Sequence, residues 1–270
     1  MTHTRPVLDG VDTDRPSVAR LYDFFLGGQH NFAADRELGR RLLQAEPYAR
    51  HIVAENRKFL GRAVQFLLAS GVRQFLDLGS GIPTQENVHE IARRGDPQAR
   101  VVYVDNDPVA VAHSKHILAG DPLAAVINAD LRQPESVLSH PDVTSMLDFS
   151  EPVGVLMVAV LHFVPDSDDP AGLVYRFTRA LVPGSCLVIS HATHEAAPGS
   201  AARVQDLYKG TTASAHTRTS AEIAWFFDGF EMVEPGLVYL PQWRPDGGLP
   251  EHPERAWFYA GVGRKAPDPR

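Results

Sequence analysis

The chain has 270 residues, which is enough for one large or two modest domains with a substantial hydrophobic core. Its net charge of −7, without a run of basic residues, argues against a dedicated nucleic-acid-binding protein. The single cysteine, Cys186, excludes an internal disulfide and a cysteine-rich metal site. The longest apolar run, at residues 153–164, is too short to span a bilayer. We therefore expect a cytoplasmic protein with neither a nucleic-acid nor a membrane partner.

The first quarter of the chain shows helical spacing only. Residues 1–14 are polar and interrupted by prolines, so we expect a flexible tail there. The apolar residues that follow predict three helices, over residues 17–26, 31–45 and 47–70. Asn31 is expected to cap the second of them. Together these helices predict an N-terminal helical cap over residues 15–70.

After residue 71, strand-like and helical segments alternate. Strands are predicted at 73–79, 99–107, 124–132, 152–163, 184–193, 229–240 and 255–265, and helices at 84–94, 108–119, 169–181 and 220–227. This alternation predicts a Rossmann-like domain over residues 71–270, with a doubly wound, mostly parallel seven-stranded α/β sheet. The last two strands nearly adjoin in sequence, so one of them can run antiparallel at the end of the sheet. Residues 196–219 are expected to form an insertion that either sets substrate specificity or serves as a mobile cover.

The first predicted strand ends in LDLGSGIPTQ, where the chain passes through two glycines into a helix. Gly79 and Gly81 let the backbone turn sharply and approach a ligand closely. The next strand ends at Asp105, and an acid at that place in an open α/β sheet accepts hydrogen bonds from ribose hydroxyls. The pattern therefore predicts an adenosine-type ligand, and two classes of cofactor fit it.

Two residues near this turn separate the two classes. A dinucleotide-binding turn places a small residue where Thr84 stands. Asp77, two residues before Gly79, would put like charges together at a pyrophosphate. It suits a ligand with a cationic amine, such as the methionyl part of S-adenosylmethionine. A nicotinamide-dependent oxidoreductase is therefore the less favoured interpretation.

Four motifs, in the same order, resemble those of the class I S-adenosylmethionine-dependent methyltransferases. FLDLGSGIP is similar to their motif I, VVYVDNDP to the acidic strand-2 motif, NADLR to the strand-3 motif and VLMVAVLHFVPD to the strand-4 motif. The resemblance spans about residues 50–265 and implies S-adenosylmethionine as cofactor and S-adenosylhomocysteine as product. The cofactor-binding residues that it implies are Asp77, Gly79, Ser80, Gly81, Asp105, Asn106, Asp130, Leu131 and Ala159. Among these, Asp130 would meet the adenine amino group.

The stretch RLYDFFLGGQHNFAADRE, residues 20–37, resembles the N-terminal signature of an uncharacterised branch of that superfamily, with Tyr-Asp, Gly-Gly and Asn-Phe. In class I methyltransferases the helices before the first strand commonly cover the carboxyl edge of the sheet. We therefore expect Tyr22 and Asn31 to face the cofactor or the acceptor. Simple packing of the helices is the alternative.

Histidines near the carboxyl edge of the sheet are the candidates for catalysis. His162 follows the fourth predicted strand and is the catalytic candidate, with His191 and His194 after the fifth strand as further possibilities. Methyl transfer from a sulfonium works mainly by positioning and desolvation, and it needs a base only when the acceptor must lose a proton. The spacing of His191 and His194 would suit a metal, but a third ligand is missing from the pattern, so no metal is expected.

The sequence thus predicts an S-adenosylmethionine-dependent methyltransferase that acts on a small-molecule acceptor. The identity of the acceptor and the oligomeric state stay open. Because no base is evident, the alternative is a protein that binds the cofactor as a sensor, or a homologue without catalytic activity.

Overall fold

The computed structural model describes residues 11–83 and 86–267, so most of the predicted tail, and Thr84 of the turn, lie outside the described residues. Three helices come first, as predicted: α1 (Val18–Phe25), α2 (Ala33–Ala45) and α3 (Ala49–Ala69). The predicted cap at Asn31 is wrong by one position, because the residue that precedes α2 in extended conformation is Phe32. The Asp35 side chain accepts a hydrogen bond from the Phe32 N–H at 2.8 Å and so completes this helix start.

The sheet is mostly parallel, and its strand order is β3-β2-β1-β4-β5-β8-β6, with β7 also paired to β8. The parallel strands are β1 (Gln74–Leu78), β2 (Arg100–Asp105), β3 (Ala124–Asn128), β4 (Val153–Val158) and β5 (Cys186–Ala192). The antiparallel strands are β6 (Phe230–Met232), β7 (Val238–Tyr239) and β8 (Phe258–Lys265). The doubly wound prediction is confirmed. The described part of the chain has eight strands because the predicted strand at 229–240 is divided into β6 and β7.

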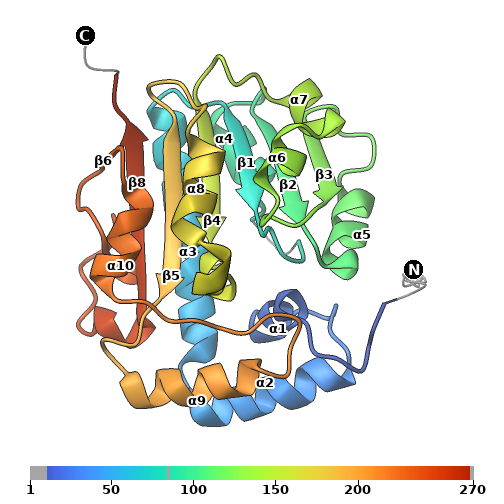
Figure 1. The fold of residues 1–270 in the computed structure, drawn as a ribbon, viewed down its shortest axis with the longest axis vertical. Helices are drawn as coiled ribbons and strands as arrows, with labels where there is room; N and C mark the ends of the chain where they lie inside the picture. The colour runs from blue at the N-terminus through green and yellow to red at the C-terminus, as the bar shows by residue number, and fades with distance from the viewer. Residues whose placement is uncertain (1–10, 84–85, 268–270) are drawn as a thin grey trace.

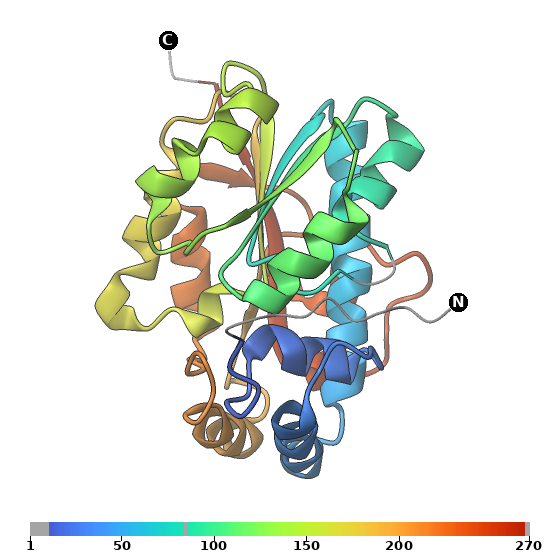
Figure 2. The same cartoon turned by 90° about the vertical axis from the view of Figure 1, so that its right-hand side faces the viewer.

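Helices cover both faces of the sheet (Figures 1 and 2). On one face lie α3, α4 (Val88–Gly95) and α5 (Pro108–Ile117), which share a buried core with side chains such as Phe75 and Leu156. On the other face lie α6 (Pro134–Leu138), α7 (Pro141–Met146), α8 (Pro170–Thr178) and α10 (Ser220–Ala224). Because both faces are covered, β4 is buried from Val153 to Met157, which explains the continuous apolar run of its sequence.

Several predicted boundaries shift. The strand predicted at 152–163 ends at Val158, because Ala159 adopts a left-handed backbone with φ 54° and the chain then forms the short helix η1 (Leu161–Phe163). The short helices α6 and α7 were not predicted. The remaining short helices are η2 (Asp166–Asp168), η3 (Trp225–Phe227), η4 (Leu240–Gln242) and η5 (Pro253–Ala256).

Residues 196–219, which the sequence predicts as an insertion, contain a further helix, α9 (Pro198–Tyr208), that the sequence did not predict. In Figures 1 and 2, α9 lies beside α2, and together with α1 the two helices cover the end of the molecule at which the parallel strands finish. The segment after α9 is joined to the N-terminal part of the chain, since the Thr212 N–H donates to the Pro16 carbonyl at 3.0 Å. Among the described helices, none is both long and apolar enough to cross a bilayer.

Candidate active site

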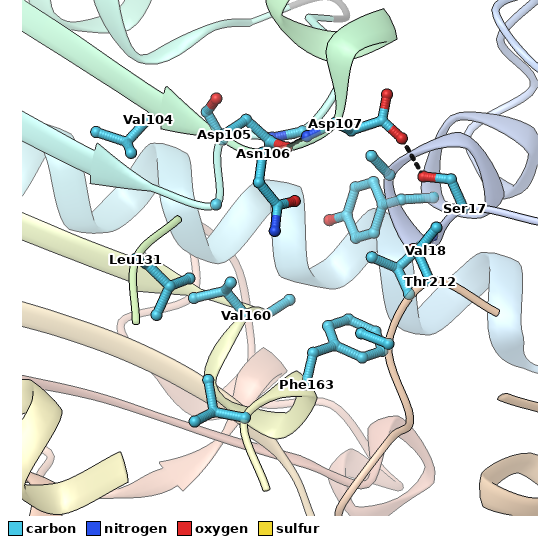
Figure 3. A pocket seen from close by; sticks show the side chains of 18 of the residues that line it. Ser17, Val18, Val104, Asp105, Asn106, Asp107, Leu131, Val160, Phe163 and Thr212 are labelled. Atoms are coloured by element: carbon cyan, nitrogen blue, oxygen red, sulfur yellow. Dashed lines mark hydrogen bonds between the residues drawn. The ribbon is translucent and has the colours of Figure 1, made fainter. Parts of the chain in front are cut away.

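A cavity of about 700 Å³ opens at the carboxyl ends of the parallel strands. Residues that follow β1, β2, β3 and β4 line it, which is the usual place for a ligand in an open α/β sheet (Figure 3). Of the residues predicted to bind the cofactor, all except Asn31 line this cavity. They are Tyr22, Asp77, Gly79, Ser80, Gly81, Asp105, Asn106, Asp130, Leu131 and Ala159.

Asp105 joins the turn after β1 to the end of β2. Its Oδ2 accepts a hydrogen bond from the Gly81 N–H at 2.7 Å, and its Oδ1 accepts one from the Asp107 N–H at 2.8 Å. Burial raises the pKa of Asp105 to about 6, although these backbone hydrogen bonds oppose the rise. A buried carboxylate in this environment favours a ligand that brings hydroxyl donors.

Asp77, on β1, is the second buried carboxyl of the cavity, with 6% of its surface exposed. Burial raises its pKa to about 7; the Arg57 guanidinium opposes this shift and Asp105 adds to it. A cationic group of a ligand would relieve the cost of ionising Asp77. Nearby, the buried Ser80 hydroxyl has no hydrogen-bond partner among the described residues. Two carboxyls and an unused hydroxyl fit a ligand that carries both an amine and ribose hydroxyls.

The turn after β1 requires glycine for two different reasons. Gly79 and Gly81 have φ angles of 74° and 68°, in the left-handed region that side chains rarely adopt. A β-carbon on Gly79 would lie only 2.3 Å from the Val160 side chain, whereas one on Gly81 would meet no atom within 4 Å. Gly79 therefore serves the packing of the strand-4 loop, and Gly81 leaves open space beside the cavity.

Asp130, after β3, is held by a neighbouring arginine. The Arg132 side chain donates to its two carboxylate oxygens, with Nη2 to Oδ2 at 2.6 Å and Nε to Oδ1 at 3.0 Å. Partial burial works against ionisation of Asp130, but the hydrogen bonds and charge of Arg132 outweigh it and lower its pKa. Asp130 is thus a fixed, ionised acceptor on the wall of the cavity.

A chain of hydrogen bonds holds Tyr22 in the cavity wall. The Ala159 N–H donates to Ser190 Oγ at 2.9 Å, and the Ser190 hydroxyl donates to Asn56 Oδ1 at 2.6 Å. Asn56 Nδ2 then donates to the Tyr22 oxygen at 2.9 Å, and the Tyr22 hydroxyl donates to the Val53 carbonyl at 3.4 Å. The donor directions agree along the whole chain. Because its hydrogen is used on Val53, Tyr22 offers a ligand the remaining lone pair of its oxygen.

The Asn31 side chain, in contrast, forms its hydrogen bonds within the N-terminal helical region, so the expectation that it faces the cavity is not met. Its Nδ2 donates to Asp23 Oδ2 at 2.8 Å and to the Gly28 carbonyl at 3.0 Å. The same carboxylate accepts the His30 N–H at 2.9 Å, and a β-carbon on Gly28 would collide with it at 1.9 Å. The Tyr-Asp, Gly-Gly and Asn residues of the signature therefore build one turn around Asp23, from which Tyr22 points to the cavity wall.

Ser17 attaches the N-terminal helices to the cofactor cavity, and sequence reasoning missed it. Its hydroxyl donates a short hydrogen bond to Asp107 Oδ2 across the cavity wall (Figure 3). Asp107 Oδ1 meanwhile accepts the Val109 N–H at 2.8 Å and caps α5. In the sequence, Ser17 was only the first residue of a predicted helix, a position that does not indicate a contact with α5.

A second, smaller cavity of about 100 Å³ adjoins the first. It lies between the three N-terminal helices, α9, the segment that follows β4, the end of β5 and the start of β8. The two cavities share four lining residues, Val18, Tyr22, Ala159 and Phe163. The second cavity is lined largely by apolar and aromatic side chains.

His162, the predicted catalytic residue, lines the second cavity and not the first. Burial, then the neighbouring His191, Arg218 and His216, lower its pKa well below the ordinary value, so its imidazole is neutral. A base with so low a pKa is a weak proton acceptor.

The other two candidate histidines, His191 and His194, lie outside the described lining of both cavities. Arg218 Nη1 donates to His191 Nε2 at 2.8 Å, and His191 Nδ1 donates to the Ala192 carbonyl at 2.8 Å. The His194 Nδ1 lies 3.2 Å from the Thr217 hydroxyl oxygen. Both rings therefore have partners within the protein.

This arrangement of a mostly parallel sheet, a glycine turn after β1, acids near the carboxyl ends of β1 and β2 and a third acid after β3 defines a nucleoside-binding protein of the class I methyltransferase type. A family model described as S-adenosyl methyltransferase matches residues 5–266. The chain belongs to this family, and it is an S-adenosylmethionine-dependent methyltransferase with S-adenosylmethionine as its cofactor.

Two solved structures are similar over nearly the whole chain. One, a DUF574 family protein from Streptomyces avermitilis MA-4680, is 40% identical; the match covers 94% of this chain and 99% of that chain, with a TM-score of 0.90. The other, a candidate methyltransferase from Thermobifida fusca YX, is 40% identical and covers 98% of this chain and 100% of that chain, with a TM-score of 0.91. Among curated proteins, no relative matches. Neither the family nor these structures support the sensor alternative.

Proposed function

We propose that the protein transfers the methyl group of S-adenosylmethionine to a small-molecule acceptor bound in the second cavity. The support for this proposal is the wall that both cavities share, formed by Val18, Tyr22, Ala159 and Phe163. A donor in the larger cavity and an acceptor in the smaller one can meet at this wall without crossing bulk water.

In this proposal, each acid of the larger cavity binds a different group of the cofactor. Asp77 pairs with the amine, Asp105 accepts from the ribose hydroxyls, and Asp130 accepts from the adenine amino group. Asn106 and Leu131 line the cavity beside these acids. The bound cofactor supplies a methyl group on a positively charged sulfur.

The chain's own contribution is to orient the acceptor and to exclude water, which lowers the barrier of a direct displacement. The Tyr22 hydroxyl has one fixed orientation, because its oxygen accepts a hydrogen bond from Asn56 and its hydrogen is donated to the Val53 carbonyl. We assign the cover to the N-terminal helices of the predicted cap at 15–70 together with α9 and the loop that follows it, which close the end of the sheet where both cavities lie.

Calorimetry with S-adenosylhomocysteine tests the cofactor site. Asp105→Ala should weaken binding by roughly 1–3 kcal/mol, because ribose hydroxyls lose a charged acceptor. Asp142→Ala, which removes an exposed carboxylate on α7, should leave the affinity unchanged. A folded Asp105 variant with wild-type affinity would remove this residue from the site.

Release of S-adenosylhomocysteine in the presence of a panel of small acceptors tests the transfer itself. Turnover with any member should fall in Tyr22→Phe by a factor that exceeds its effect on cofactor affinity. Tight cofactor binding without methyl transfer to any neutral, cationic or anionic acceptor would contradict the proposal and favour the sensor.

A further inference from the structure

Two residues that line the second cavity each have a buried ring nitrogen that no described residue satisfies. His162 Nδ1 and Trp257 Nε1 are both buried without a hydrogen-bond partner among the described residues. Both residues line this cavity, and they are only 6% and 5% exposed. Buried polar atoms in proteins almost always have a partner, so an unpaired pair at one cavity points to a ligand that supplies it.

The two rings are fixed in place by their neighbours. The Phe258 ring packs against both, at 5.3 Å from His162 and 5.9 Å from Trp257, measured between ring centroids. Trp257 also has a left-handed backbone, with φ 28° and ψ 39°, which is rare for a bulky side chain. Such strain persists only where the surrounding structure imposes it, and it is common at ligand sites.

The charges around the second cavity exclude one class of ligand. No lysine or arginine is found in its described lining, and Glu46 is the one formally charged side chain there. An anionic acceptor would lack a counter-ion and would meet a like charge. The indole N–H of Trp257 can only donate, and the neutral imidazole of His162 can accept or donate. An oxygen atom of an uncharged ligand can pair with both.

The size and lining limit the ligand to one ring. An apolar cavity of about 150 Å³ accommodates benzene. The second cavity measures about 100 Å³, which leaves room for no more than one ring, and it shares four lining residues with the larger cavity. Aromatic side chains, among them Phe25, Phe163, Tyr208 and Phe258, supply the flat surfaces against which a ring packs.

We propose that the second cavity binds an uncharged, single-ring aromatic acceptor, and that Trp257 and His162 hydrogen-bond an oxygen substituent of that ring. Neither residue lines the cofactor cavity. They therefore hold the acceptor by the end that is remote from the cofactor, and the atom to be methylated points to the wall shared with Tyr22. This gives His162 a role in binding in place of the predicted catalytic one. The proposal rests on the methyltransferase function proposed above.

Fluorinated one-ring probes test the proposal directly. Binding of 4-fluorophenol, 4-fluorotoluene, 4-fluorobenzoate and 4-fluorobenzylamine is followed by ¹⁹F NMR on the full chain, saturated with S-adenosylhomocysteine. We expect 4-fluorophenol to bind about 3–10-fold more tightly than 4-fluorotoluene, as one neutral hydrogen bond allows, and 4-fluorobenzoate to bind least. Equal affinity for the phenol and the toluene would overturn the assignment of the nitrogens, and preference for the amine would assign recognition to Glu46 instead.

Aromatic variants that lack the ring nitrogens test the hydrogen bonds. Trp257→Phe and His162→Phe should each weaken 4-fluorophenol binding by about 3–10-fold and leave 4-fluorotoluene within about twofold. Trp225→Phe and His116→Phe, which change exposed rings, are the matched controls and should alter neither. If both buried variants bind the phenol as the wild type does, the proposal is wrong.

Cofactor binding, measured in the same samples, keeps the two proposals apart. If S-adenosylhomocysteine binds and the phenol does not, only the acceptor assignment fails. If the wild-type chain does not bind S-adenosylhomocysteine, the proposed methyl transfer fails with it. Thermal unfolding checks that each variant is folded, and if one of the two buried variants does not fold, the other decides the outcome.

Discussion

Asp77→Asn should make the cofactor-free protein more stable while it weakens cofactor binding. Burial raises the pKa of Asp77 from 3.8 to about 7, with Arg57 opposing and Asp105 adding to the shift. Above about pH 7 the carboxyl is ionised in both the folded protein and the unfolded chain. A rise in pKa of this size then lowers the free energy of unfolding by about 4 kcal/mol. Asparagine has nearly the same shape and carries no charge, so it removes this cost.

The stabilisation should depend on pH in a defined direction. Because the folded pKa lies above the unfolded one, the native state binds more protons between about pH 4 and pH 7, and wild-type stability falls as the pH rises through that window. The gain from Asp77→Asn should therefore be about 2–3 kcal/mol larger at pH 8 than at pH 5. Cofactor affinity should fall roughly tenfold or more at pH 8, because a charge-assisted hydrogen bond to the amine is lost.

Urea unfolding at the two pH values and calorimetry with S-adenosylhomocysteine measure both effects. Asp142→Asn, in which an exposed carboxyl is replaced by an amide, is the matched control. A gain that is the same at pH 5 and pH 8, or a loss at both, would refute the reasoning, since it would mean that the folded protein already stabilises the ionised carboxylate. Unchanged cofactor affinity would remove Asp77 from the amine site.

Three further substitutions test the turn and the cover. Gly79→Ala should lower the free energy of unfolding by about 2–4 kcal/mol, because the new β-carbon would collide with Val160. Gly81→Ala should lower it by only about 1–2 kcal/mol, because only the positive φ angle opposes the substitution. Equal losses in urea unfolding would contradict this difference. Ser17→Ala should weaken S-adenosylhomocysteine binding roughly threefold to tenfold, because it breaks the contact with the carboxylate that caps α5. The exposed control Ser145→Ala should bind normally, and the same result for Ser17→Ala would show that this contact does not hold the cover.

The repeating part of the fold was predictable because local pattern and topology agree there. Each parallel strand is short, apolar and followed by a turn, so its place in the chain could be recognised from the sequence. The two-residue β7 and the short helices α6 and α7 carry no such pattern, since their structure depends on the elements against which they pack. α9 escaped prediction because its small and polar residues also suit a loop.

The candidate site divides in the same way. Acids and glycines at strand ends were predictable, since parallel strands bring these ends to one edge. Asn31 and Tyr22 looked equivalent beside the glycine pair, and only the fold shows that Asp23 takes up the Asn31 amide. Asn56 lies among apolar residues of a predicted helix, and this position indicates a buried amide that must have hydrogen-bond partners. The sequence could not identify those partners, because Tyr22 and Ser190 are distant from Asn56 in the chain.

The cover over the two cavities is made from segments that lie far apart in the chain. The Thr212 N–H bonds to the Pro16 carbonyl at 3.0 Å, and the His216 N–H bonds to the His162 carbonyl at 2.7 Å. Few such bonds have to break for the segment after α9 to separate from α1, and none of them belongs to the sheet. Native-state hydrogen exchange should therefore find the amides of this segment and of α1 exchanging together, well below the free energy that protects β4 and β5. The contacts that keep water out are then also the ones that set the rate at which ligands enter and leave.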